Sequence, residues 1–462
     1  MVKLSNTVIE ALKTQARGTV LLPGDPGYEA SRKIWNAMID RRPAGIIQCA
    51  GVADVMLAVT VARDNGLLVS VRGGGHNIAG SAICDDGLLI DLSAMKSVHI
   101  NPGTRRAYVE PGASLGDFDH EAQAFGLATS LGINSTTGVA GLTLGGGFGW
   151  LTRKHGLTID NLVSVEIITA DAERVRASAD ENPDLFWAVR GGGGNFGIVT
   201  MFEFQLHPVG PEILAGLIVY PFEQAEAVLA AYRRFVDTIH ADLNVWVVLR
   251  QAPPLPFLPE AVHGKDVVVL ALFFDGDPKL GMSVIEPLRG LGSSYGEHIG
   301  PMPYTAWQKA FDPLLTPGAR NYWKSHNFTE LSDGAIATAI EYAGKLPSPQ
   351  CETFIALLGG QASRVVSDAT AYSARDTQFV MNMHARWETA EEDQACIAWA
   401  REFFAKVEPF ATGSVYVNFM TEEEVDRIPS AYGANQNKLE QIKKKVDPDN
   451  FFRVNQNIKP SA

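Results

Sequence analysis

The sequence has few cysteines and lacks the closely spaced ligands of a metal site. Its 462 residues include four cysteines, with no CxxC pair, and ten histidines, with no HxxxH or HxH pair. Structural metal sites depend on such spacings. We therefore expect no metal, and we expect Cys49, Cys84, Cys351 and Cys396 to be reduced thiols in the core.

Excess positive charge and long apolar runs are also absent. Asp and Glu outnumber Lys and Arg by 52 to 39, so the net charge is −13, which argues against nucleic acid or an anionic membrane as partner. The one basic cluster, residues 443–445, is predicted to lie on the exposed face of a helix. No run reaches membrane-spanning length, and residues 1–15 lack the apolar core of a signal peptide. We expect a cytoplasmic protein, and the sequence does not indicate its oligomeric state.

Glycine, in contrast, is abundant and clustered. The sequence has 44 glycines, many of them in three clusters at residues 72–77, 138–149 and 190–197. Predicted strands lie beside each cluster. A glycine turn leaves backbone N–H groups open to a phosphate, and Arg72 would add charge at the first turn. That turn joins two strands, whereas a Rossmann dinucleotide site joins a strand to a helix. Each cluster alone is also explained by a tight turn, but one large cofactor in contact with all three is the simpler hypothesis.

The remaining patterns predict an α+β fold. Helical spacing covers residues 52–65 and 115–125, and residues 97–113 and 163–178 are typical of hairpins. After residue 207, helices alternate with strands that we expect to form an antiparallel sheet. Those strands are predicted at residues 243–251, 266–276, 351–360 and 377–388, with a further strand at 413–420 in the tail.

Four motifs, in order along the chain, resemble those of a known family. They are RGGGHN at 72–77, GVAGLTLGGGFG at 138–149, RGGGGNFGIVT at 190–200 and DPDNFFRVNQNI at 447–458. They are similar to the motifs of the berberine-bridge-enzyme-like flavoproteins of the vanillyl-alcohol-oxidase superfamily. The resemblance covers nearly the whole chain, although the middle third matches only loosely.

The resemblance implies an α+β architecture with a PCMH-type FAD-binding domain of two subdomains. This domain would occupy residues 1–207. A substrate-binding domain, residues 208–411, would place an antiparallel sheet over the flavin, and residues 412–462 would return to the FAD domain.

The resemblance also implies FAD with one covalent bond, from His76 to the flavin 8α carbon. Many members add a second bond from a cysteine, but aligning GGGFG places Asn134 at that position, so we expect the single link of some bacterial members. A histidyl link raises the potential of the flavin as an electron acceptor. The residues expected to bind FAD are Arg72, Gly73, Gly74, Gly75, His76, Asn77, Gly80, Ser81, Thr137, Gly138, Gly141, Asn195, Gly197, Val199 and Asn455.

The activity implied by the resemblance is that of an oxidase. A base would take a proton while a hydride passes from a substrate carbon to the flavin, and dioxygen would then reoxidise the flavin to give hydrogen peroxide. Alcohols, sugars, amines and phenolic or polyketide compounds are all substrates within the family. A dehydrogenase with another electron acceptor and a non-catalytic flavin-binding protein remain alternatives. Thr137 matches the position that gates oxygen in relatives.

Candidates for the base lie in the tail. Tyr432, in AYGAN, matches the loop where relatives carry a catalytic tyrosine, and Tyr416 and Asn418 would share one face of the predicted tail strand. A tyrosine with a pKa near 10 needs a neighbouring donor or cation to act at neutral pH. The candidates for the substrate pocket are Tyr322, Trp323, His326, Asn382, His384 and Arg386. The last three alternate along one strand face, which is equally compatible with solvent.

Overall fold

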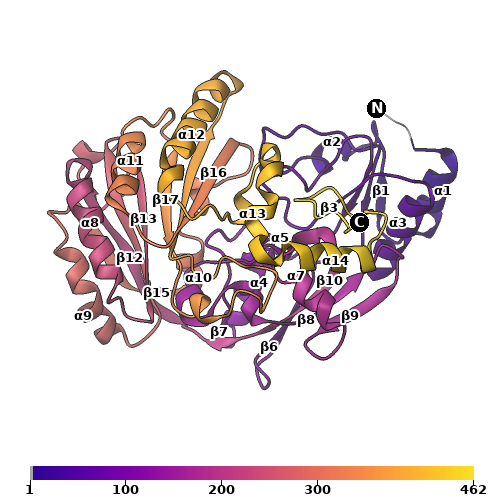
Figure 1. Cartoon of the computed structure of the whole chain (residues 1–462), viewed down its shortest axis with the longest axis horizontal. Helices are drawn as coiled ribbons and strands as arrows, with labels where there is room; N and C mark the ends of the chain where they lie inside the picture. The colour runs from indigo at the N-terminus through magenta and orange to yellow at the C-terminus, as the bar shows by residue number, and fades with distance from the viewer. Residues whose placement is uncertain (1–3) are drawn as a thin grey trace.

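The computed structural model of the chain describes residues 4–462 and contains three larger sheets with helices packed against them (Figure 1). The first two sheets lie near the N-terminus, and the third forms the opposite end of the molecule. The α+β class expected from the sequence is confirmed. No helix between residues 4 and 462 combines the length and apolar character needed to cross a membrane.

The first sheet has four strands in the order β1-β2-β4-β3, and β2, β3 and β4 run parallel. Its elements are α1 (Asn6–Gln15), β1 (Thr19–Leu21), α2 (Tyr28–Ser31), β2 (Gly45–Gln48), α3 (Val52–Asp64), β3 (Val69–Arg72) and β4 (Leu88–Asp91). The first glycine cluster leaves the carboxyl end of β3 and leads to another strand, as predicted. Open sheets of parallel strands bind ligands at this end.

The second sheet has five antiparallel strands in the order β5-β6-β10-β8-β9. Both predicted hairpins are confirmed. The elements are β5 (Val98–Asn101), β6 (Arg106–Val109), α4 (Leu115–Gln123), β7 (Leu127–Ala128), α5 (Val139–Leu144), α6 (Thr152–His155), β8 (Leu162–Ile168), β9 (Arg174–Ser178), α7 (Pro183–Val189), β10 (Ile198–Gln205) and β11 (His207–Pro208). The second glycine cluster opens α5, and the third connects α7 to β10.

The third sheet has seven antiparallel strands in the order β15-β12-β14-β13-β17-β18-β16. Its elements are β12 (Glu212–Pro221), α8 (Ala225–Val236), β13 (Leu243–Gln251), β14 (Asp266–Phe274), α9 (Pro278–Arg289), β15 (Gly296–Pro303), α10 (Tyr304–Gln308), β16 (Arg320–Phe328), α11 (Asp333–Ala343), β17 (Glu352–Leu357), β18 (Phe379–Trp387) and α12 (Asp393–Val407). The predicted antiparallel sheet is confirmed. The predicted domain boundaries at 207/208 and 411/412 stay predictions.

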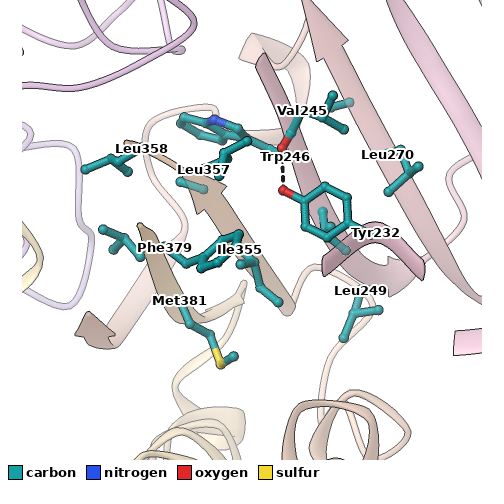
Figure 2. Packing of buried hydrophobic residues seen from close by; sticks show 14 of the residues in the cluster. Tyr232, Val245, Trp246, Leu249, Leu270, Ile355, Leu357, Leu358, Phe379 and Met381 are labelled. Atoms are coloured by element: carbon teal, nitrogen blue, oxygen red, sulfur yellow. Dashed lines mark hydrogen bonds between the residues drawn. The ribbon is translucent and has the colours of Figure 1, made fainter. Parts of the chain in front are cut away.

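Both faces of the third sheet are buried, which explains the nearly continuous apolar runs of β13 and β14. Helices α8, α9, α11 and α12 cover the outer face (Figure 1). Figure 2 shows part of this layer, where Tyr232 of α8 lies among apolar side chains and donates its hydroxyl to the Val245 carbonyl at 2.7 Å. The opposite face is turned toward the glycine clusters.

The tail contains α13 (Ile428–Tyr432) and α14 (Gln436–Val446) and returns to the N-terminal part of the molecule (Figure 1). The strand predicted at 413–420 is wrong, because Val417–Phe419 form a 3₁₀ turn. Val415, Tyr416 and Val417 are all buried, and Tyr416, Val417 and Asn418 line a cavity. Val415 and Val417 also pack in the core of the second sheet.

Lys443 is fully buried, so the prediction of an exposed basic cluster is wrong for this residue. Its ammonium group donates to the carbonyls of Asn195 at 2.7 Å and Phe452 at 2.9 Å, and it pairs with Asp447 at 2.5 Å. Burial lowers the pKa of Lys443, and Asp447 opposes that shift. Asp447 also accepts the N–H groups of Phe451 and Phe452. The DPDNFF motif thus anchors the tail to the third glycine cluster.

Two histidines stack where α6 meets β11. The rings of His155 and His207 are 3.9 Å apart and nearly parallel, and His207 Nε2 lies 2.6 Å from Asn161 Oδ1. Burial lowers the pKa of His155 to about 3, with further lowering from His207 and Lys154. Burial, followed by Arg105 and Lys154, also lowers the pKa of His207. Both rings are therefore neutral near pH 7.

We expect this pair to make the fold sensitive to acid. Both folded-state pKa values lie below the ordinary value of about 6.5, so the unfolded chain binds more protons as the pH falls from about 6.5 toward the folded-state values. The contribution of the two neutral rings to the free energy of unfolding is therefore fully present above about pH 6.5 and is lost as the pH falls toward the folded-state pKa values. His155→Phe keeps a ring against His207 and removes one titrating group, so its free energy of unfolding should fall less between pH 7.5 and 4.5. Equal losses in urea titrations of both proteins would contradict this explanation.

Candidate functional site

The three glycine clusters meet at one cavity of about 640 Å³. The first two are in backbone contact, since a Cβ on Gly74 would lie 2.5 Å from the Cα of Gly138. No side chain larger than hydrogen fits there. The predicted FAD-binding residues that line the cavity are Gly73, Gly74, Gly75, His76, Asn77, Ser81, Thr137, Gly138, Gly141, Asn195, Gly197, Val199 and Asn455.

The residues of this cavity fit a large ligand that lies directly on the backbone. A Cβ on Gly141 or Gly194 would meet no atom within 4 Å, so both positions leave room toward the cavity that they line. Asn455 donates to the Gly194 carbonyl at 3.2 Å, while its buried Oδ1 has no donor within residues 4–462. A dinucleotide cofactor would cover the glycine backbone and could offer that oxygen a partner.

Arg72 and Gly80 do not line the cavity. The Arg72 guanidinium forms two hydrogen bonds with Asp91, at 2.5 and 3.1 Å, and donates to the Ser31 carbonyl. It therefore holds β3 to β4 and cannot add charge to a bound phosphate, which corrects the prediction for its side chain. Gly80 has a φ of +77° and packs against Ile39.

His76 stands at the end of the first cluster with its ring held on two sides. It stacks on Trp35, with ring centroids 5.1 Å apart and planes inclined by 20°, and its Nε2 lies 3.1 Å from Thr136 Oγ1. Burial lowers the pKa of His76 to about 4, although Thr136 opposes the shift. The imidazole is therefore neutral near pH 7, as a nucleophile must be.

Tyr416 has the best-supported phenol oxygen in the cavity. This oxygen accepts hydrogen bonds from the Gly147 N–H at 3.1 Å and from Asn418 Nδ2 at 2.9 Å. Burial raises the pKa of Tyr416 to about 12, and the bonds from Asn418 and Gly147 lower it. Because both bonds end on the oxygen, neither of them uses the hydroxyl proton, and a phenolate formed at Tyr416 would keep two donors.

Tyr432 also lines the cavity, at the end of α13. Its buried hydroxyl has no hydrogen-bond partner in the described part of the chain, and burial raises its pKa. A phenolate at Tyr432 would lack the support that Tyr416 receives. The expectation that Tyr432 is the base stays a prediction, and the geometry favours Tyr416.

Three charged or titratable side chains from neighbouring strands form a polar pole, defined here as Arg250, Glu352 and His384. Arg250 Nη1 lies 2.7 Å from one carboxylate oxygen of Glu352, and His384 Nδ1 lies 3.3 Å from the other. Burial raises the pKa of Glu352, but Arg250 and His384 outweigh it, so that the pKa lies below its ordinary value. Burial lowers the pKa of His384 despite Glu352. The pole is an ionised carboxylate between a guanidinium and a neutral imidazole.

Comparison with known proteins agrees with this geometry. Residues 43–178 match the family described as FAD binding domain, and residues 415–459 match the family described as berberine and berberine like. The chain is 32% identical over 466 residues to (R)-6-hydroxynicotine oxidase of Paenarthrobacter nicotinovorans, across 96% of this chain and 97% of the relative. The chain belongs to the berberine-bridge-enzyme-like FAD-linked oxidoreductases.

Solved structures share the whole fold. The crystal structure of 6-hydroxy-D-nicotine oxidase from Arthrobacter nicotinovorans superposes with a TM-score of 0.87 at 28% identity, covering 99% of this chain and 100% of the other. Glucooligosaccharide oxidase from Acremonium strictum, described with a 6-S-cysteinyl, 8α-N1-histidyl FAD, superposes with a TM-score of 0.88 at 24% identity and 99% coverage of this chain. The protein is thus an FAD-linked oxidoreductase.

Aromatic side chains form most of the wall opposite the glycine clusters in this berberine-bridge-enzyme-like protein. Phe419 contacts Trp323 and Phe354 edge to face, with ring centroids 5.5 and 5.8 Å apart. Trp246 and Phe311 also line the cavity, Phe148 and Trp150 line it from the second glycine cluster and the residue after it, and Pro253 and Leu255 come from the loop after β13. Apart from Trp323, none of these side chains was predicted.

The predicted substrate residues are divided between the two faces of the third sheet. His384 and Trp323 line the cavity. Tyr322 and His326 alternate with Trp323 along β16 and point to α12, where Tyr322 bonds to Glu423 and Arg401 and His326 stacks on Phe404. These last two therefore lie outside the cavity lining.

Asn382 and Arg386 flank His384 on β18 but do not line the cavity. Arg386 donates to the Thr316 carbonyl at 2.7 Å and lies 5.5 Å from the centroid of the Trp35 ring, so it joins the third sheet to the segment beside His76. Asn382 is fully buried, and neither polar atom of its side chain has a partner among residues 4–462.

Proposed function

We propose that this FAD-linked oxidoreductase is an oxidase that takes a hydride from a substrate carbon bonded to nitrogen or oxygen and uses dioxygen as its electron acceptor. FAD would be linked to His76 through a single covalent bond. The observation that carries the proposal is that one cavity is lined by the three glycine clusters, His76, the Tyr416 oxygen with its two donors and the half-buried carboxylate of Glu352.

FAD supplies the acceptor of the hydride when it is bound. The protein's contribution is to hold the substrate and to move a proton. In its phenolate form Tyr416 takes the proton of the substrate N–H or O–H group, and the Gly147 N–H and the Asn418 amide stabilise that phenolate. The aromatic wall excludes water, which strengthens both bonds.

The lining favours one class of substrate. Its aromatic and aliphatic walls suit a flat apolar body, and the polar pole offers the Glu352 carboxylate to an N–H or O–H group. An oligosaccharide carries hydroxyl groups around its ring and would leave many of them without partners against such walls. We therefore propose an aromatic or alicyclic amine or alcohol as the substrate. One relative, (R)-6-hydroxynicotine oxidase, is named for a substrate of this class.

An anaerobic screen followed by an oxygen measurement tests this function. Cyclic amines, aromatic alcohols, phenols and oligosaccharides are each mixed with the holoenzyme while flavin absorbance is recorded. Amines or alcohols with an apolar body should bleach the flavin, and admitting air should restore the absorbance with one hydrogen peroxide formed per substrate. A bleached flavin that persists in air but recovers at once with an artificial acceptor would identify a dehydrogenase instead.

Thr137 is expected to control the reaction with oxygen. It lines the cavity beside Gly138, and its small β-branched side chain leaves room that a larger residue would fill. Thr137→Leu should slow flavin reoxidation by dioxygen several-fold and leave the rate of reduction by substrate unchanged. Thr137→Ser is the matched control and should reoxidise at the wild-type rate. Equal reoxidation in the Leu variant would remove Thr137 from this role.

A further inference from the structure

A chain of hydrogen bonds leads from Asn134 to His76. Asn134 Oδ1 accepts the Thr136 N–H at 3.0 Å and the Thr136 hydroxyl at 2.8 Å, and Thr136 Oγ1 lies 3.1 Å from His76 Nε2. Asn134 is buried, whereas Thr136 is exposed. The backbone of Thr136 also interacts with His76 and opposes the lowering of its pKa by burial.

The direction of each bond follows from what each atom can do. A backbone N–H only donates, so the Asn134 atom that receives it is the amide oxygen. The amide oxygen can only accept, so the Thr136 hydroxyl donates its single proton to Asn134 Oδ1. Toward His76, Thr136 can therefore offer only a lone pair, and Nε2 must carry the ring proton. Since the imidazole is neutral, Nδ1 holds the free lone pair.

We propose that Asn134 and Thr136 are positioning residues that fix the tautomer of His76 and so select Nδ1 as the atom that bonds to the flavin. This inference rests on the proposed covalent link. Stacking on Trp35 holds the ring plane, while the bond from Thr136 determines which nitrogen is nucleophilic. Asn134, which occupies the position of the cysteine that forms the second flavin bond in many family members, thus supports the bond from His76.

The linkage reaction balances as follows. The Nδ1–C8α bond forms, and one C–H bond of the 8α methyl group and the Nε2–H bond break. Two protons leave to water and two electrons enter the flavin ring, from which dioxygen takes them to give hydrogen peroxide. In the other tautomer the proton would sit on Nδ1, and that atom could not attack.

The test measures attachment in the full-length chain made under riboflavin limitation and then supplied with FAD. Thr136→Val removes the hydroxyl at nearly constant volume. The fraction of covalently bound flavin, measured after acid precipitation, should then grow about five- to tenfold more slowly, because one neutral hydrogen bond is worth about that factor. Thr136→Ser should restore the rate. Asn134→Asp keeps an acceptor and should link normally, while Asn134→Ala should be slow.

Two further readouts separate positioning from a general structural role. Reversible FAD affinity, measured before linkage, should be unchanged in Thr136→Val, and the double variant with Asn134→Ala should be no slower than Thr136→Val alone. The control is Ser135→Ala, because the Ser135 hydroxyl bonds to Asp312 and not to His76; it should link at the wild-type rate.

The site of attachment gives the sharpest outcome. Nuclear magnetic resonance of the flavin peptide released from wild-type protein should show the bond at Nδ1. A bond at Nε2, or Thr136→Val linking as fast as wild type, would overturn the inference while leaving the covalent oxidase intact. Wild-type protein without any covalent flavin would instead overturn the proposed link itself.

Discussion

Tyr416→Phe is expected to lower the rate of flavin reduction by about 10²–10⁴-fold, the range for loss of general-base assistance. The variant keeps the ring that packs against Phe148 and Phe419 and removes only the oxygen. Stopped-flow mixing with substrate under anaerobic conditions measures the effect. Without that oxygen the Gly147 N–H and the Asn418 amide lose an acceptor, so stability should fall by about 1–3 kcal/mol, which thermal unfolding measures separately.

Two other tyrosines serve as comparisons for Tyr416. Tyr432→Phe tests the base predicted from the motif. Because its oxygen has no donor among residues 4–462, we expect the rate of flavin reduction to change by only a few-fold. Tyr372→Phe controls for the loss of a buried hydroxyl alone. The rings of Tyr372 and Tyr416 are neighbours, with centroids 6.5 Å apart. A 10²-fold loss in Tyr432→Phe with near-normal reduction in Tyr416→Phe would reverse the assignment.

His76→Ala should release all of its flavin when the protein is precipitated with acid, whereas wild-type protein should stay yellow. The expectation rests on the proposed link through His76, whose neutral imidazole stands at the end of the first glycine cluster. The variant should still bind FAD reversibly, because the glycine backbone is unchanged, and it should turn over more slowly because the flavin loses the electron-withdrawing link.

The matched control for His76→Ala is Cys84→Ala. Cys84 is a buried free thiol in the turn that follows the first glycine cluster, and it does not line the cavity. Its removal should leave flavin attachment complete. Retention of covalent flavin in His76→Ala would show that another residue forms the bond.

Much of the fold was predictable because its signals are local. The hairpins at β5–β6 and β8–β9 combine alternating side chains with turn residues, and the third sheet follows from apolar runs such as β14. The glycine clusters were recognisable for the same reason. At Tyr416 and Asn418 the alternating pattern misled, because the chain forms a 3₁₀ turn there and three successive residues, 415–417, are buried.

The polar pole could not be predicted because it depends on strand order. Arg250, Glu352 and His384 come from three strands that are neighbours only in the folded sheet, and alternation along one strand does not say which face meets the cavity. Lys443 did carry a usable signal. It lies one turn after the buried Leu439 and one turn before Asp447, so helical spacing assigns it to the inner face.

The anchoring of the tail has a consequence for the order of assembly. Asn195 in the third glycine cluster donates to the Gln456 carbonyl and accepts the Ile458 N–H, contacts that span 261 and 263 residues. A ribosome needs on the order of tens of seconds to add that many residues. Until then the third glycine turn lacks the backbone that holds it, and Asn455 has not yet been added. A chain that stops before residue 447 lacks the contacts that hold the third glycine turn, so we expect it to bind FAD less tightly than the full-length chain.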